Sequence, residues 1–261
     1  MRIDRWLVEH GYAASRTLAA KAIEAGRVSL NGRVVSKPSR PVEAEDHVGV
    51  SEPETPEYVS RAGHKLAGAL RAFPDIRADG LRCLDAGAST GGFTQVLLES
   101  GAAQVTAVDV GHGQLDSRIR GDARVTAIEG LNVRDLTCEV IGGPVDLVVG
   151  DLSFISLRLV VEPLSRVTRA GGSLILMVKP QFEVGRSRLG KGGVVRDDAD
   201  REAAIEGVRV ASRAAGLEIV GEQPSGLPGQ NGNREHFLHL RKPATDASGG
   251  EREKLGSAEP R

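Results

Sequence analysis

Apolar and polar residues follow two different periods along the middle of the chain. From residue 81 onward, short apolar runs of strand type alternate with amphipathic runs of helical spacing. The strand-like runs cover 82–86, 104–110, 125–129, 145–150, 173–178 and 217–221, and the helical runs cover 93–100, 157–169 and 198–215. This alternation predicts an α/β fold, with a mostly parallel sheet covered by helices on both faces. Ligands bind such sheets at the carboxyl ends of the strands.

The first 50 residues show a different and more compact pattern. An apolar helical face at Ile3 and Leu7 is interrupted at Gly11, and Ser15 is placed to cap a second helix that ends before Gly26. Asn31-Gly32 then separates two short β-prone runs, which indicates a tight hairpin. Two helices followed by a hairpin predict a small α+β domain.

Composition divides the chain into four segments. Residues 1–50 form the small domain, and 51–60, which contain prolines and glutamates, read as a linker. Residues 61–242 form the α/β domain. Residues 243–261 are rich in Ala, Ser, Gly and charge, so we expect a disordered tail.

Charge and apolar content narrow the class of protein. The net charge is −1, but residues 1–40 hold eight basic and three acidic side chains, or 8 − 3 = +5. Charge alone leaves open a polyanion contact or a solvated basic face. The apolar runs are too short to span a bilayer and no signal peptide precedes them, so we expect a cytoplasmic protein without membrane association. Two cysteines without ligand spacing predict neither a disulfide scaffold nor a metal site.

A glycine-rich loop follows the first strand of the α/β domain. It reads D-A-G-A-S-T-G-G at 85–92, and Asp109 ends the next strand. Glycines let the backbone pass close to a ligand, and an acid at a strand end can accept hydrogen bonds from ribose hydroxyls. A dinucleotide site remains an alternative on these grounds. The loop resembles motifs I and II of the class I S-adenosylmethionine methyltransferases, and this resemblance implies cofactor contacts by Asp85, Gly87, Ala88, Ser89, Thr90, Gly91, Gly92, Asp109, Val110, Asn132 and Asp151.

Four charged residues lie where the chemistry of such an enzyme takes place. Asp151 and Lys179 follow consecutive strands, Glu235 begins the last strand, and Lys65 lies on the helix that opens the domain. They match the Lys-Asp-Lys-Glu tetrad of FtsJ-type 2′-O-ribose methyltransferases. We assign Lys179 as general base, Lys65 as the charge that lowers its pKa and as a substrate contact, and Asp151 as the group that orients the amine. Glu235 fixes the ribose or a lysine. Taken singly, each could be an ordinary surface or capping residue.

The alternative base methyltransferases have other signatures. An exocyclic-amine enzyme carries N-P-P-Y or D-P-P-Y after the fourth strand, and a cytosine carbon-5 enzyme carries a Pro-Cys nucleophile. Here the fourth strand ends in G-D-L-S-F at 150–154, and neither cysteine follows a proline.

The first 50 residues resemble the S4 RNA-binding domain. The matching runs are R-I-D-R-W-L at 2–7, S-R at 15–16, I-E-A-G-R-V-S-L-N-G at 23–32 and V-S-K-P at 35–38. Lysine and arginine suit RNA binding because they neutralise phosphates. The resemblance implies RNA contacts by Arg5, Arg16, Lys21, Arg27 and Lys37, to which we add Arg61 and Lys65 of the second domain.

Taken together, the segments resemble the TlyA (haemolysin A) family. The matching runs include V-S-R-A-G-H-K-L at 59–66, D-L-V-V-G-D-L-S-F-I-S-L at 146–157, V-K-P-Q-F-E-V-G at 178–185 and G-N-R-E-H-F-L at 232–238. The resemblance implies 2′-O-methylation of cytidine in ribosomal RNA within ribosomal subunits, with no metal. A monomer is favoured. A membrane-active haemolysin and a non-catalytic ribosome-binding protein remain the rival functions.

Overall fold

The structure, a computed structural model, describes residues 1–13, 15–51, 57–229 and 231–244. The chain divides into two compact units, Met1–Glu57 and Tyr58–Arg261. The predicted linker and tail include 52–56 and 245–261, which lie outside the described residues. Each unit is described by itself below.

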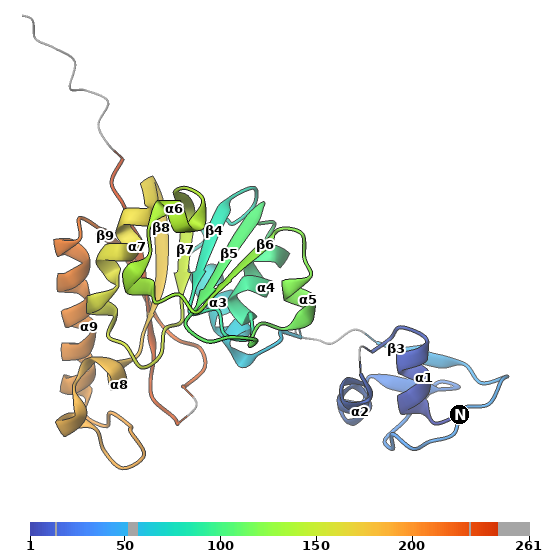
Figure 1. The fold of residues 1–261 in the computed structure, drawn as a ribbon. Coiled ribbons are helices and arrows are strands. Elements are labelled where there is room, and N and C mark those ends of the chain that lie inside the picture. The colour runs from blue at the N-terminus through green and yellow to red at the C-terminus, as the bar shows by residue number, and fades with distance from the viewer. Residues whose placement is uncertain (14, 52–56, 230, 245–261) are drawn as a thin grey trace, which may run out of the picture. The chain divides into compact units, whose positions relative to one another are not determined.

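The N-terminal unit packs two helices against a small antiparallel sheet (Figure 1). Its elements are α1 (Ile3–Glu9), α2 (Arg16–Glu24), β1 (Val28–Leu30), β2 (Arg33–Val34) and β3 (Val48–Val50), with strand order β2-β1-β3. Asn31 and Gly32 both have positive φ, at 51° and 75°, which is the backbone of the expected hairpin turn. The predicted helices and hairpin are confirmed, whereas β3 was not foreseen.

Ser15 caps α2, because its hydroxyl accepts a hydrogen bond from the Leu18 backbone nitrogen at 3.3 Å. Apolar residues at helical and strand spacing then meet in one core. It comprises Ile3, Leu7, Ala19, Ala22, Ile23, Val28, Leu30, Val35 and Val42.

The second unit is built on a sheet of seven strands within the described residues. The order is β6-β5-β4-β7-β8-β10-β9, and β10 runs antiparallel to both of its neighbours. The other adjacent pairs are parallel, so the predicted mostly parallel α/β sheet is confirmed. The strands are β4 (Arg82–Ala86), β5 (Gln104–Asp109), β6 (Val125–Glu129), β7 (Val145–Gly150), β8 (Thr168–Val178), β9 (Glu218–Pro224) and β10 (His236–Arg241).

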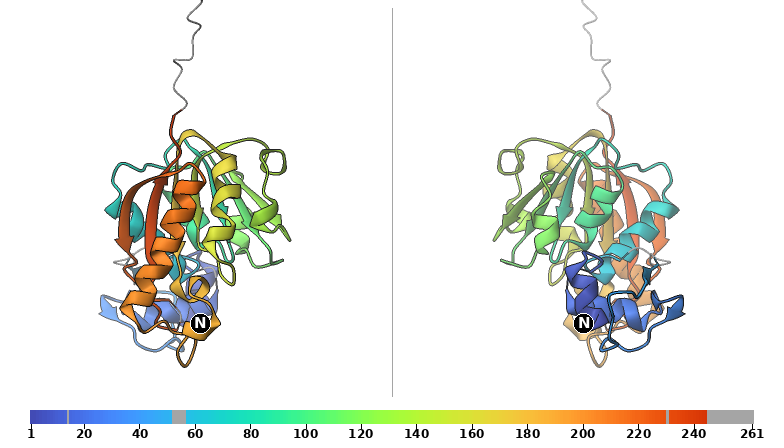
Figure 2. Two further views of the ribbon diagram at one scale, coloured as in Figure 1. Left: turned by 90° about the vertical axis from the view of Figure 1, so that its left-hand side faces the viewer. Right: turned by 90° about the vertical axis from the view of Figure 1, so that its right-hand side faces the viewer.

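Helices cover both faces of this sheet, as the two views of Figure 2 show. One face packs against α3 (Arg61–Ala72), α4 (Gly92–Glu99) and α5 (Ser117–Arg120). The opposite face packs against α6 (Cys138–Ile141), α7 (Val161–Val167) and α9 (Asp198–Ala214). Shorter elements border the carboxyl ends of the strands: η1 (Val133–Asp135), η2 (Leu157–Leu159), α8 (Pro180–Glu183) and η3 (Arg186–Arg188).

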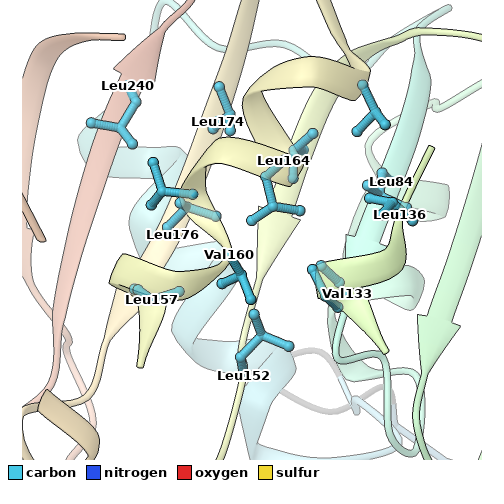
Figure 3. Close-up of a cluster of buried hydrophobic side chains, with 14 of the residues drawn as sticks. Leu84, Val133, Leu136, Leu152, Leu157, Val160, Leu164, Leu174, Leu176 and Leu240 are labelled. Atoms are coloured by element: carbon cyan, nitrogen blue, oxygen red, sulfur yellow. The ribbon is translucent and has the colours of Figure 1, made fainter. Parts of the chain in front are cut away.

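Alternating strand residues supply the two cores. On β4, Leu84 points to the core beneath α7 and Cys83 to the core beneath α4. Figure 3 shows the first of these, where Leu84, Val160, Leu164 and Leu176 meet. Cys83 is a buried free thiol, and burial raises its pKa to about 12. Cys83 therefore contributes to the packing of the core and does not act as a nucleophile.

One predicted helix is wrong in extent. The pattern at 157–169 indicates a single helix, but the structure divides it into η2 and α7, and β8 starts already at Thr168. Thr168 pairs with Val145 of β7, so pairing with the neighbouring strand outweighs the helical spacing of its side chain. In the described part of the chain, no helix has both the length and the apolar character required to cross a membrane.

Candidate active site

The glycine-rich loop 87–91 connects β4 to α4 and bends at residues with left-handed backbone. Gly87 has φ of +84°, and a Cβ placed there would lie 3.1 Å from the Asp151 backbone oxygen. Gly91, the N-cap of α4, has φ of +95°. Both positions therefore require glycine, and the backbone of the loop can approach a ligand without intervening side chains.

Asp109, at the end of β5, fixes this loop from the adjacent strand. Its Oδ2 accepts a hydrogen bond from the Ser89 backbone nitrogen at 2.8 Å, and its Oδ1 accepts one from Gly111 at 2.7 Å. The carboxylate is half-buried and lines a cavity of about 700 Å³. Each oxygen has a second lone pair, so the carboxylate can still accept hydrogen bonds from ligand hydroxyls in that cavity.

The 700 Å³ cavity has apolar and polar walls suited to a nucleoside. It is lined by Gly87, Ser89, Asp109, Val110, Gln114, Leu131, Asn132, Val133, Arg134, Asp151, Leu152, Ser153, Phe154, Ile155, Ser156 and Leu159. The predicted residue Val110 is 68% exposed there. Asn132 also lines the cavity, but its Oδ1 accepts a hydrogen bond from the Arg134 backbone nitrogen and caps η1. Asn132 therefore has a structural role in addition to its predicted one.

Asp85 is the buried member of the predicted cofactor set. Its Oδ2 accepts a hydrogen bond from the Thr94 hydroxyl at 2.6 Å, and its Oδ1 has no hydrogen-bond partner among the described residues. Burial is the main cause that raises the pKa of this carboxyl to about 7, and the nearby carboxylates of Asp151 and Asp109 add to it.

Asp85→Asn is expected to stabilise the ligand-free protein more at pH 8 than at pH 5. In the unfolded chain Asp85 ionises near its ordinary pKa of 3.8, whereas the folded protein keeps the proton until about pH 7. Unfolding between these two pKa values releases a proton, so the free energy of unfolding decreases as the pH rises, by about 4 kcal/mol in all and by about 3 kcal/mol between pH 5 and pH 8. Asparagine does not titrate, so the stability of Asp85→Asn lacks this contribution to the pH dependence.

The comparison uses urea unfolding of both proteins at pH 5 and pH 8, with the exposed Asp75→Asn as the matched control. The raised pKa of Asp85 would be contradicted if the free energies of unfolding of wild type and Asp85→Asn differed by the same amount at both pH values.

The four predicted catalytic residues form two ion pairs. Lys179 Nζ lies 2.6 Å from Asp151 Oδ1, and Lys65 Nζ lies 2.5 Å from Glu235 Oε2. Lys65 and Lys179 are each 9% exposed and Glu235 is 5% exposed. The strand order β7-β8-β10 brings Asp151, Lys179 and Glu235 to the same end of the sheet. Helix α3 supplies Lys65. Each lysine thus has its own carboxylate partner.

Lys65, Asp151 and Lys179 line a second cavity of about 410 Å³. Ser60, Arg61, Ala62, Phe93 and Pro228 line it as well. Gly87, Ser89, Asp151 and Ser153 belong to the walls of both cavities. A ligand in the larger cavity and a ligand in the smaller one would therefore meet beside Asp151 and its partner Lys179.

Comparison with known proteins places this arrangement in a family. The FtsJ-like methyltransferase family model matches residues 58–242, and the S4 domain model matches residues 1–48. The 16S/23S rRNA (cytidine-2′-O)-methyltransferase TlyA of Mycobacterium tuberculosis is 48% identical over 92% of this chain and 89% of its own length. The chain belongs to the TlyA family of FtsJ-like methyltransferases.

Other relatives agree with this membership of the TlyA family. Hemolysin A of Brachyspira hyodysenteriae is 37% identical over 92% of this chain and 99% of its own length. A solved structure from Streptococcus thermophilus, 35% identical, superposes with a TM-score of 0.70 over 95% of this chain and 91% of its own.

The S4 domain of this TlyA-family chain carries the predicted RNA contacts, and several of them have intramolecular partners. Arg16 pairs with the buried Asp4 at 2.8 Å, and Arg5 pairs with Glu9 at 2.6 Å. Arg2 and Arg16 hold the pKa of Asp4 at about 2. Arg16 therefore stabilises the domain core, although its side chain remains 60% exposed.

The other predicted RNA contacts differ in how exposed they are and in whether they have an intramolecular partner. Arg27 is half-buried and forms an ion pair with Glu57. Lys21 and Lys37 are exposed and form no ion pair within the described part of the chain. In the methyltransferase domain, Arg61 donates a hydrogen bond to the Pro228 carbonyl oxygen at 3.2 Å.

Some residues that shape the TlyA-family site were missed by sequence reasoning. Ser153 accepts a hydrogen bond from Lys179 Nζ at 2.8 Å, and its place in D-L-S, two residues after Asp151, was the available signal. Glu183 is a buried carboxylate that accepts hydrogen bonds from the Ser156 hydroxyl and the Leu157 backbone nitrogen. Its partners lie more than 20 residues away in the sequence, so no local pattern indicates them.

Phe154 is the other residue that was missed. It is 92% exposed, has φ of +64° and borders the 700 Å³ cavity, with its ring 5.3 Å from that of Phe182. A large aromatic residue held in solvent on left-handed backbone is unusual and indicates a contact surface.

Proposed function

We propose that this protein transfers a methyl group from S-adenosylmethionine to the 2′-hydroxyl of a cytidine in ribosomal RNA within ribosomal subunits. The observation that carries the proposal is the Lys179–Asp151 ion pair, which lies where the two cavities meet. Lys65, the partner of Glu235, lines the smaller cavity as well. The nucleotide and the RNA are those in the name of the Mycobacterium tuberculosis relative. A cytoplasmic location of the activity is part of this proposal, and the ribosomal substrate in the names of the relatives supports it.

The residues of the larger cavity fit this methyl donor. Asp109 can accept hydrogen bonds from its ribose hydroxyls, and Val110 and Leu159 offer exposed apolar surface to an adenine. The glycine backbone at 87–91 accommodates the amino-acid portion, since a Cβ at Gly87 would close the gap to Asp151. When bound, S-adenosylmethionine supplies an electrophilic methyl group on a sulfonium centre.

The protein's own residues supply the remaining chemistry. A ribose hydroxyl is a poor nucleophile, so its proton must leave as the oxygen attacks. Lys179 first releases to solvent the proton that it holds in the ion pair with Asp151, and its amine then accepts the hydroxyl proton as the 2′-oxygen attacks. Asp151 and Ser153 hold the Nζ atom in position. Lys65, fixed by Glu235, contacts the substrate in the 410 Å³ cavity. Both ion pairs are largely shielded from water, which preserves their geometry.

Phe154 gives the substrate side a surface for a nucleobase. Its ring is exposed at the border of the donor cavity, and aromatic side chains stack on unpaired bases of RNA. The exposed lysines of the S4 domain, Lys21 and Lys37, add phosphate contacts that do not depend on sequence.

The proposed function predicts incorporation of tritiated methyl groups into ribosomal subunits at linkages that resist alkali. Alkaline cleavage of RNA requires a free 2′-hydroxyl, so a methylated ribose leaves a resistant dinucleotide, whereas a methylated base does not. Subunits from a strain that lacks the gene are incubated with the protein, and the resistant dinucleotides are identified. Label found only in alkali-labile mononucleotides would indicate a base methyltransferase, and no label on any subunit would support a non-catalytic binding protein.

A further inference from the structure

A basic loop follows the catalytic lysine and is not used in the mechanism above. It covers residues 185–196, between α8 and α9, and carries Arg186, Arg188, Lys191 and Arg196 without any acidic residue. All four side chains belong to exposed residues. In the described part of the chain, only Arg188 among them forms an ion pair, with Asp200 at 3.0 Å. Arg186, Lys191 and Arg196 therefore carry positive charge without an ion-pair partner among the described residues.

Buried hydrogen bonds fix the base of this loop next to the active site. Asn233 is buried, accepts a hydrogen bond from the Val195 backbone nitrogen at 2.9 Å and donates one to the Gly193 carbonyl oxygen at 3.0 Å. Glu235, the partner of Lys65, lies two residues farther along the chain. At the other end, the loop begins after α8, which starts directly behind Lys179. Both anchors are thus neighbours of catalytic side chains.

The tip of the loop leaves room for a ligand to come close to its backbone. Gly192 and Gly193 have positive φ, and a Cβ at either position would meet no atom within 4 Å. Lys191 lies beside them, and the turn is closed by a hydrogen bond from the Gly190 backbone nitrogen to the Val194 carbonyl oxygen at 3.0 Å. A rigid substrate can therefore reach the backbone and Lys191 together.

A cavity of about 440 Å³ borders the same loop. It is lined by Arg158, Phe182, Glu183, Val184, Gly185, Arg188, Ala203 and Ala204. Both arginines of this cavity have carboxylate partners, Arg158 with Glu183 and Arg188 with Asp200, and both side chains remain about half exposed. Guanidinium groups bind phosphate oxygens through paired hydrogen bonds.

We infer that the loop 185–196 is a second RNA-binding surface, which holds phosphates of the strand that carries the target nucleotide. This inference rests on the proposed function for the identity of the polyanion. The target ribose must enter the 410 Å³ cavity beside Lys65 and Lys179, so the phosphates that flank it pass close to the carboxyl ends of β8 and the start of β10. The cations of the loop lie at that edge and belong to the methyltransferase domain.

The test is the salt dependence of binding by the full-length protein. Each lost phosphate contact reduces the slope of log affinity against log salt by about 0.7 to 0.9. The variant Arg186→Gln/Lys191→Gln/Arg196→Gln is therefore expected to bind ribosomal subunits with a slope that is smaller by about 2 to 3. The matched control, Arg71→Gln/Arg77→Gln/Arg241→Gln, removes three exposed cations at the opposite end of the sheet and is expected to keep the wild-type slope.

Protein-free ribosomal RNA at low salt identifies the partner. A reduced slope on this RNA as well supports phosphate contacts, whereas a reduction on intact subunits alone would mean that the loop binds a ribosomal protein and would overturn the inference. An unchanged slope on both probes would also overturn it. Should the triple variant unfold, Lys191→Gln alone serves, because its side chain has no ion-pair partner within the described residues, and a slope smaller by about 0.7 to 0.9 is expected.

Methyl transfer by the wild type in the same samples separates this inference from the proposed function. Methylation together with an unchanged slope rejects the loop and retains the function. A reduced slope without methylation supports RNA binding by the loop and rejects the proposed methyltransferase function.

Discussion

Replacing Lys179 with alanine is expected to slow methyl transfer to ribosomal subunits by about 10²- to 10⁴-fold, the usual contribution of a general base. The Nζ atom lies 2.6 Å from Asp151 and 2.8 Å from Ser153, and 9% of the residue is exposed. Among the described residues, Lys65 is the other lysine that lines the 410 Å³ cavity, but its partner is Glu235, whereas the partner of Lys179 is Asp151, which belongs to the walls of both cavities. Alanine leaves the donor cavity intact, because Lys179 is not part of its wall.

Single-turnover kinetics with tritiated donor measure this effect, and calorimetry measures donor affinity, which is expected to stay within about twofold of wild type. Lys242→Ala is the matched control, since Lys242 donates to the Ser165 and Thr168 carbonyl oxygens at the far end of β8. Wild-type rates in Lys179→Ala would refute the base assignment.

Replacing Glu235 with alanine is expected to destabilise the protein by about 3 kcal/mol and to abolish most of the activity. The side chains of Lys65 and Glu235 are 10% and 3% exposed, so the substitution leaves an ammonium group buried without its counter-charge. The misplaced Lys65 no longer positions substrate, which costs roughly 10²-fold in rate.

The double variant Lys65→Met/Glu235→Ala separates these two effects. Removing both charges is expected to restore most of the lost stability, because a neutral, well-packed replacement avoids the buried charge. It is not expected to restore methyl transfer. Urea unfolding and single-turnover kinetics are measured on the same samples, and Glu162→Ala, which breaks the exposed pair with Arg166, is expected to cost about 0.5 kcal/mol or less. Recovery of activity in the double variant would show that the pair serves stability alone.

The glycine-rich loop and its backbone could be predicted from the sequence because their requirements are local. The loop 87–91 requires glycine at Gly87 and Gly91, two positions of left-handed backbone that lie only four residues apart in the chain. The hairpin at Asn31-Gly32 and the cap at Ser15 follow from turn and capping preferences of the same kind. The division of 157–169 into η2, α7 and the start of β8 could not be predicted, since pairing between Thr168 and Val145 decides it.

The sequence by itself determined the order of strands and helices and the presence of two domains, and it predicted a set of candidate catalytic residues. Only the tertiary structure decided how charges pair. Lys65 meets Glu235 across 170 residues, Arg16 turns to the buried Asp4, and Asn233 fixes the basic loop beside the active site. The physical reason is that turns and caps depend on neighbouring residues, whereas a buried ion pair depends on which elements the strand order brings together.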